Sequence, residues 1–325
     1  MKAQAKSTSA AITDLKGRLP AFSLEHVFEH SKHPELDAYW QLYGFNSVLS
    51  REASSDAQYY FGAQTLADYA IASHYWSNPS SRGTVLVVHG LFDHVGLYLP
   101  LVKRLLDENY SVFAIDLPEH GLSSGEYGDL SHFQSYYAVI DDFAREVMPV
   151  IGGPWFSVGQ STGASVLMGH ILLSVEPSFE RSVFFAPLVR PKAYWSVRLL
   201  HLFLSPFLKR IKRSFTVNSH DQSFCDFLKY EDPLQQRYIS VAWVGAMLEW
   251  VEAFSSFPVS DHSVFIVQGR NDSTVDSHYN IDAITQKFPN IRLCDVLDSM
   301  HHITRESQGR QKQAFDLAVE FLEGT

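Results

Sequence analysis

Short apolar segments of strand length alternate with segments of helical spacing along much of this 325-residue chain. We expect strands at 84–88, 111–115, 155–158, 182–185, 264–267 and 291–296. We expect helices at 99–108, 131–147, 162–175, 277–288 and 307–322. Continuous apolar strands that alternate with helices are typical of βαβ units, whose parallel strands lie buried between helices. The pattern therefore predicts an α/β protein with a mostly parallel central sheet flanked by helices.

The alternation stops between residues 187 and 258, where no strand-like run recurs. Helical spacing dominates there, at 194–211 and 238–254. We interpret residues 187–258 as a helical lid that is inserted after the sixth strand. The lid divides an α/β core made of residues 56–186 and 259–325.

Residues 1–55 precede the regular pattern and are interpreted as an N-terminal extension. Its start is rich in Ser, Ala, Thr and Lys, which is typical of a frayed tail. Apolar and aromatic positions at 21–45 indicate one or two short helices after that tail. Further on, residues 69–76 partly alternate between apolar and polar, which predicts an antiparallel strand.

Composition limits the partners and the environment of the chain. The net charge is −10 and the pI is near 5.8, whereas proteins that track nucleic-acid phosphates are usually basic. No stretch approaches the roughly 18 consecutive apolar residues of a transmembrane helix. The first residues lack the apolar segment of a secretory signal. The two cysteines lack the spacing of a disulfide framework, which favours a reducing, cytoplasmic location.

The sharpest local motif is Gly159-Gln160-Ser161-Thr162-Gly163, which matches G-x-S-x-G. An expected strand precedes it and an expected helix follows it, as in a nucleophile elbow. There the serine sits on a strained turn, and the glycines keep side chains away where strand and helix nearly collide. An ordinary Gly-Ser turn is the alternative. The context favours Ser161 as a nucleophile.

A serine nucleophile needs a base and an orienting acid, which follow it in the order Ser, Asp or Glu, His in α/β-hydrolases. Asp272 lies just beyond the strand expected at 264–267, and Asp276 lies four residues later. Asp276 could equally cap the helix that follows it. The last expected strand leads to His301 and His302, so either histidine can be the base.

Acyl transfer also needs hydrogen-bond donors for the oxyanion. His89-Gly90 ends an early strand, where backbone N–H groups can point at a developing negative charge. We expect the amides of Leu91 and Thr162 to be these donors, and a simple strand-end turn at His89-Gly90 is the alternative. The residues expected to line the substrate site are His89, Gly90, Phe92, Gln160 and Leu188.

These segments together resemble the α/β-hydrolase superfamily, and within it the monoacylglycerol lipase and lysophospholipase group, also described as the serine aminopeptidase S33 family. Residues 89–98 look like that group's H-G-x-x-x-H-x-x-x-Y segment. Residues 114–125 look like its D-x-x-G-H-G-x-S-x-G segment, with Glu119 in place of a glycine. The resemblance runs from about Tyr69 to the C-terminus and implies the α/β-hydrolase fold.

The resemblance also favours one residue of each open pair. Residues 269–272 match the position of the family's acid, which implies Asp272 rather than Asp276. Residues 299–306 resemble the family's segment around the base, which implies His301 rather than His302. Three residues of the elbow depart from the family pattern without removing a triad member, and they are Gln160, Thr162 and Ala164.

We therefore expect a serine hydrolase that cleaves carboxylic esters through a Ser-His-Asp triad and an acyl-enzyme. The resemblance implies lipid-like substrates such as monoacylglycerol or lysophospholipid, with no metal or organic cofactor. An aminopeptidase or amidase is one alternative, in which Glu231, Asp232 or Glu249 would bind a substrate amine. A non-catalytic ligand-binding protein on the same fold is another, because a fold alone does not define a function.

The first half of the expected lid is basic and apolar. No acidic residue lies between Pro187 and Phe215, whereas Arg and Lys recur among aromatic and aliphatic residues. An apolar helix face edged by basic residues suits transient contact with an anionic membrane surface. A cap helix that packs its apolar face on the core, with its basic residues in solvent, is the alternative and the commoner arrangement.

Overall fold

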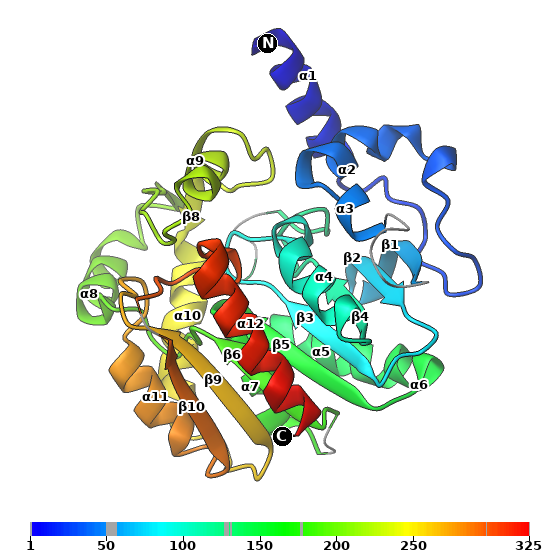
Figure 1. Ribbon diagram of the computed structural model, residues 1–325. Coiled ribbons are helices and arrows are strands. Elements are labelled where there is room, and N and C mark those ends of the chain that lie inside the picture. The colour runs from blue at the N-terminus through cyan, green and yellow to red at the C-terminus, as the bar shows by residue number, and fades with distance from the viewer. Residues whose placement is uncertain are drawn as a thin grey trace.

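The computed structural model describes residues 2–49, 57–126, 130, 132–175, 178–296 and 298–324. An eight-stranded sheet runs through the molecule in the order β1-β2-β4-β3-β5-β6-β9-β10 (Figure 1). Its strands are β1 Gln58–Leu66, β2 Tyr69–Ser77, β3 Thr84–Val88, β4 Ser111–Ile115, β5 Trp155–Gln160, β6 Arg181–Phe185, β9 Ser263–Gly269 and β10 Ile291–Val296. β1 and β2 are antiparallel, and the other six are parallel. The predicted α/β-hydrolase sheet is confirmed, and β1 is a strand that the sequence pattern did not predict.

Helices cover both faces of this sheet, and each face has its own apolar cluster. One cluster includes α4 Leu99–Asp107 and α12 Gln308–Glu323. The other includes α5 Gln134–Glu146, α7 Thr162–Leu173 and α11 Ser277–Thr285. Strand β3 supplies residues to both clusters, because successive side chains of a strand point to opposite faces. Ser131, the expected first residue of the helix that is now α5, lies outside the described residues.

The insert between β6 and β9 holds three helices within the described residues. They are α8 Tyr194–Leu204, α9 Gln222–Tyr230 and α10 Val241–Phe254. The helix expected at 194–211 ends earlier, because Pro206 has no N–H to continue the helical hydrogen bonds. The expectation of no strand here was wrong, since Arg210–Lys212 and Tyr238–Ser240 pair as β7 and β8. Strands of three residues are too short to leave a sequence pattern.

The N-terminal segment is helical at its start and packs on the core further along. Residues Lys2–Thr13, expected as a tail, form helix α1, which projects from the body in Figure 1. Within the expected range 21–45 lie α2 Asp37–Tyr43 and, before it, the 3-10 turns His30–Lys32 and Pro34–Leu36. A further short helix, α3 Asn46–Leu49, follows just beyond that range. Tyr39, Trp40 and Phe45 are buried in the same cluster as α4 and α12. The expected boundary at residue 55 lies outside the described residues.

Two further features concern the environment of the chain. Within the described residues, no helix is both long and apolar enough to cross a bilayer. Among the described residues, Cys225 and Cys294 form no disulfide.

Candidate active site

Ser161 lies on a strained turn between β5 and α7. Its φ of 53° and ψ of −113° are unusual for a residue with a side chain. A Cβ on Gly163 would lie 2.2 Å from the Val88 carbonyl oxygen, and a Cβ on Gly159 would lie 2.6 Å from the Ala164 nitrogen. Strand, turn and helix therefore meet closely enough that both outer positions of the motif require glycine.

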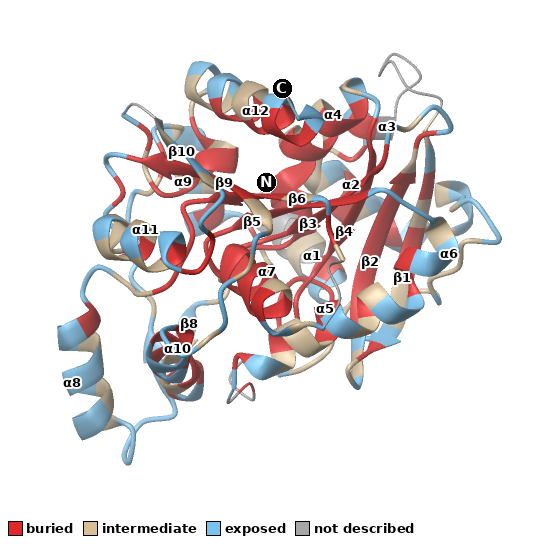
Figure 2. Ribbon diagram, turned by 90° about the horizontal axis from the view of Figure 1, so that it is seen from below, coloured by how far each residue is buried: buried red, intermediate tan, exposed pale blue. Residues whose placement is uncertain are grey.

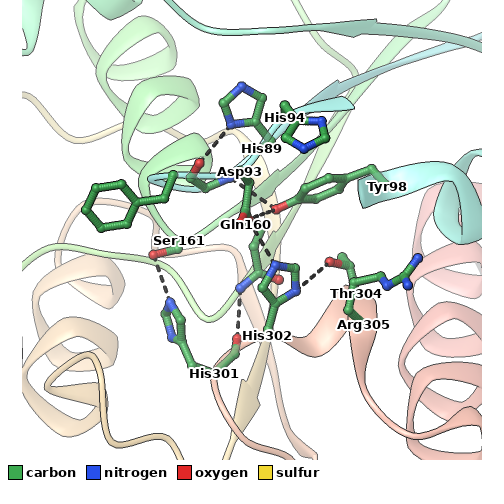
Figure 3. A network of polar contacts seen from close by, with 12 residues as sticks. His89, Asp93, His94, Tyr98, Gln160, Ser161, His301, His302, Thr304 and Arg305 are labelled. Atoms are coloured by element: carbon green, nitrogen blue, oxygen red, sulfur yellow. Dashed lines mark hydrogen bonds and ion pairs between the residues drawn. The ribbon is translucent and has the colours of Figure 1, made fainter. Parts of the chain in front are cut away.

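The parallel strands bring distant segments together at their carboxyl ends. His301 Nε2 lies 3.0 Å from Ser161 Oγ. On the other side of the ring, His301 Nδ1 lies 2.8 Å from Asp272 Oδ2. A serine, a histidine and an aspartate in this linear arrangement form the geometry that activates a serine nucleophile. Figure 3 shows the contact between Ser161 and His301.

Asp272 is held as an ionised acceptor by several donors. The backbone N–H groups of Thr274 and Val275 donate to Oδ1 over 2.7 and 3.1 Å, and Gln268 Nε2 donates to Oδ2 over 3.0 Å. Burial opposes ionisation, but His301 and these N–H groups outweigh it, so the pKa of Asp272 lies below its usual value. Sequence reasoning missed Gln268, because a single glutamine at the end of a strand carries no motif.

The pKa of His301 shifts in the opposite direction. Burial acts to lower the pKa of His301, but the Asp272 carboxylate outweighs it and raises that pKa above the ordinary value. His301 is 7% exposed and Asp272 is 5% exposed, so water screens their attraction weakly.

The two alternatives that the sequence left open occupy other positions. The Asp276 carboxylate accepts from the Tyr279 N–H at the start of α11 and pairs with Arg190 over 2.6 Å. It is therefore a helix cap, as one interpretation of the sequence predicted. His302 Nε2 lies 3.0 Å from Asp93 Oδ2, away from the Ser161 hydroxyl.

The expected oxyanion donors lie beside Ser161. A Cβ on Gly90 would lie 3.4 Å from Ser161 Cβ, so the end of β3 touches the elbow. Leu91 and Thr162 both line the cavity that contains Ser161. In the described part of the chain, neither of these two backbone N–H groups has a hydrogen-bond partner. Both donors are therefore available to a ligand oxygen.

A buried hydrogen-bond network holds the segment that follows β3, from Gly90 to Asp93 (Figure 3). The Tyr98 hydroxyl accepts from the Gly90 N–H over 3.1 Å and donates to Asp93 Oδ2 over 2.8 Å. Asp93 also pairs with His302, the residue after His301. Burial opposes ionisation of Asp93, but His302 outweighs it and lowers the pKa of Asp93. Tyr98 is the last residue of the H-G-x-x-x-H-x-x-x-Y segment, but the sequence did not predict its hydrogen bonds to Gly90 and Asp93.

The substrate residues expected from the sequence divide into two groups. Gly90, Phe92, Gln160 and Leu188 line the cavity of about 420 Å³ around Ser161. The prediction for His89 was wrong, because its ring is buried and faces the Gly90 carbonyl and the Leu117 N–H. Burial and the neighbouring His120 lower the pKa of His89 to about 3, so the ring is neutral.

Gln160 has a structural contact as well as a place in the cavity wall. Its Nε2 donates to the carbonyl oxygen of His301 over 2.8 Å. The residue before Ser161 thus holds the backbone at His301 (Figure 3). The remaining wall is largely apolar, and much of it comes from the insert, including Val197, Phe215, Leu228, Ile239, Trp243 and Met247.

The sheet order, the elbow and the Ser-His-Asp geometry define the class of α/β-hydrolases. The chain belongs to the family described as serine aminopeptidase, S33, which it matches over residues 79–308. This membership confirms the family resemblance expected from the motifs and makes the protein a hydrolase by family. No curated protein sequence matches the chain significantly.

Solved structures share the fold at low sequence identity. A soluble variant of monoglyceride lipase from Saccharomyces cerevisiae is 18% identical with a TM-score of 0.69, covering 83% of this chain and 94% of that one. Monoacylglycerol lipase from Paleococcus ferrophilus is 20% identical with a TM-score of 0.65, covering 78% and 98%. An esterase from Exiguobacterium antarcticum is 12% identical with a TM-score of 0.58, covering 81% and 98%.

Proposed function

We propose that the protein hydrolyses carboxylic esters with an extended acyl chain, using Ser161 as nucleophile. The observation that carries the proposal is the contact of Ser161 Oγ with His301 Nε2 at the wall of a largely apolar cavity. Monoacylglycerol and lysophospholipid are the substrate types that fit such a site. Similar folds among solved monoglyceride lipases and an esterase support the choice.

The proposed reaction has two halves. Ser161 Oγ attacks the ester carbonyl carbon while His301 Nε2 takes the hydroxyl proton, and the Leu91 and Thr162 amides stabilise the oxyanion. The carbon–oxygen bond to the alcohol then breaks, and His301 returns the proton to the leaving alcohol. In the second half, His301 activates water, which releases the acyl group as a carboxylic acid and restores Ser161.

The apolar wall predicts a dependence on acyl length. Each methylene buried in a pocket contributes about 0.8 kcal/mol, which corresponds to roughly a fourfold gain in kcat/KM. We expect nitrophenyl esters from acetate to decanoate to show this rise until the chain outgrows the cavity. Steady-state kinetics with this series test the prediction, and the highest kcat/KM for acetate would contradict an extended acyl site.

An aminopeptidase activity has weaker support. None of the three carboxylates expected to bind a substrate amine lines the cavity around Ser161. Glu231 is exposed, Asp232 is buried against His94, and Glu249 pairs with His132. Within the described residues, the lining carboxylates are Asp93 and Asp226, and Asp93 already faces His302. Parallel assays with nitrophenyl esters and prolyl amides separate the two activities, and faster amide cleavage would favour the peptidase.

We further propose that α8 contacts an anionic membrane surface. The exposed fractions of Trp195, Leu202 and Phe203 are 68%, 67% and 64%, so the apolar face of this helix meets solvent. Figure 2 shows α8 as a largely exposed element at the edge of the molecule. Exposed basic residues follow it in the chain, namely Lys209, Arg210 and Lys212. This arrangement departs from the commoner core-facing helix and suits anionic lipid headgroups.

Vesicle sedimentation tests the membrane proposal. We expect more wild-type protein to pellet with vesicles containing phosphatidylglycerol than with pure phosphatidylcholine, and less with the Phe203→Asp variant. Val150→Asp is the matched control, because Val150 is 71% exposed on the separate helix Met148–Ile151. Equal recovery of wild type with both vesicle types, or equal loss with both variants, would contradict the role of α8.

A further inference from the structure

The turn that carries Leu91 has a backbone conformation that needs support. The Asp93 N–H donates to the Gly90 carbonyl over 3.1 Å and closes the turn. Phe92, the third residue of the turn, has a φ of 68°. Glycine adopts this left-handed conformation readily, whereas a residue with a bulky side chain is strained in it. Such strain persists only where neighbouring groups hold the backbone in place.

Two side chains of the insert contact Phe92 directly. Gln235 Nε2 donates to the Phe92 carbonyl oxygen over 2.9 Å. The Arg213 guanidinium carbon lies 3.9 Å from the centre of the Phe92 ring, within the range of a cation–π contact. Arg213 Nη1 also donates to Gln235 Oε1 over 2.8 Å. The two side chains therefore contact each other, and together they contact both the backbone carbonyl and the ring of Phe92.

The same part of the insert is attached at a second point. Asp232 Oδ2 lies 3.1 Å from His94 Nε2, and both side chains are fully buried. The Tyr43 hydroxyl of the N-terminal segment donates to Asp232 Oδ1 over 2.5 Å. Gln235, three residues after Asp232, is itself 4% exposed. The segment from Asp232 to Gln235 thus contacts the core at Phe92 and at His94, the two residues that flank Asp93.

We propose that Gln235 and Arg213 are positioning residues, which hold the Gly90–Asp93 turn so that the Leu91 amide faces the oxyanion formed at Ser161. The inference rests on the ester hydrolysis proposed above. Both residues belong to the insert, so the strength of the oxyanion hole depends on how the insert is seated on the core. Tyr98 of the core holds the turn through Gly90 and Asp93. Gln235 and Arg213 of the insert hold it through Phe92.

The Gln235→Glu substitution isolates the proposed contact, because glutamate keeps the size of the side chain and an acceptor for Arg213. It replaces the donor to the Phe92 carbonyl with an oxygen that repels it. We expect kcat to fall about tenfold to a hundredfold with a nearly unchanged KM, as for a small misplacement of a catalytic group. Arg213→Ala should act in the same direction.

A second measurement separates positioning from general disruption. A trifluoromethyl ketone forms a hemiketal oxyanion with the serine, whereas an ether analogue of the substrate does not. In Gln235→Glu we expect the inhibition constant of the ketone to rise in parallel with the loss of kcat/KM, and that of the ether to stay constant. Gln236→Ala is the matched control, because Gln236 contacts the Glu119 carbonyl, away from Phe92.

The outcomes have distinct meanings. Unchanged kcat and ketone binding in both Gln235→Glu and Arg213→Ala would overturn the positioning role. Equal weakening of ketone and ether binding would also overturn it, because the variants would then act on substrate binding in general. A wild-type protein that hydrolyses no ester would refute the proposed function itself, and the positioning role would fall with it.

Discussion

Replacing Ser161 by alanine is expected to abolish ester hydrolysis, with a loss in kcat on the order of 10⁶-fold as for other triad serines. The variant lacks the oxygen that forms the acyl-enzyme, while His301 and the backbone amides stay in place. Labelling by a fluorophosphonate should disappear together with activity, since that probe forms its bond with the same oxygen. Nitrophenyl ester kinetics and gel detection of the probe check the prediction.

Ser214→Ala is a suitable control for this experiment. Ser214 lines the same cavity but lies in the exposed part of the insert, outside the Ser-His-Asp arrangement. We expect this variant to keep both probe labelling and activity. Persistent labelling of Ser161→Ala would show that another residue is the nucleophile, and the proposed mechanism would have to be abandoned.

Replacing Asp272 by asparagine is expected to lower kcat by about 10⁴-fold. The asparagine amide favours the wrong tautomer of the His301 ring, and it carries no charge to stabilise the imidazolium that forms during the reaction. The pH profile should change as well. The base acts in its neutral form, and Asp272 raises the pKa of His301, so wild-type activity rises with pH through a midpoint above 6.5. Without the carboxylate, burial dominates and lowers this pKa. The midpoint of residual activity should therefore move to lower pH.

Asp276→Asn is the matched control for the acid. Asp276 caps α11 and pairs with Arg190, so its replacement should affect thermal stability more than kcat. We expect the pH midpoint of this variant to match that of the wild type. A large loss of kcat in Asp276→Asn, together with a nearly normal Asp272→Asn variant, would reverse the assignment of the acid.

The sequence predicted the central strands and the spatial order of the site for a clear physical reason. Strands buried on both faces are continuously apolar, and the elbow needs Gly159 and Gly163 because backbones approach closely there. Ser161, Asp272 and His301 come together because the parallel strands that precede them all end at the same edge of the sheet.

Other features left no local pattern to read. Strand β1 pairs with β2 at the edge of the sheet, and its mixed polar and apolar residues gave no clear periodicity. The role of His89 was mistaken because burial of a histidine depends on segments distant in sequence, here the loop at Leu117. The support of Phe92 by Gln235 joins residues 143 positions apart, and neither residue belongs to a recognisable motif.

Residues 20–22 of the N-terminal segment pair with the edge strand β1 of the central sheet. The family match starts at residue 79, yet Ala21 forms a bridge with Ala63 on the outer side of β1. The Ala63 N–H donates to the Pro20 carbonyl, and the Phe22 N–H donates to the Ala63 carbonyl, each over 2.8 Å. This segment therefore satisfies the Ala63 N–H and carbonyl on the outer edge of β1, and unpaired groups on a sheet edge are the kind that pair with other chains. Residues that precede the matched family region thus cover part of the exposed edge of the central sheet.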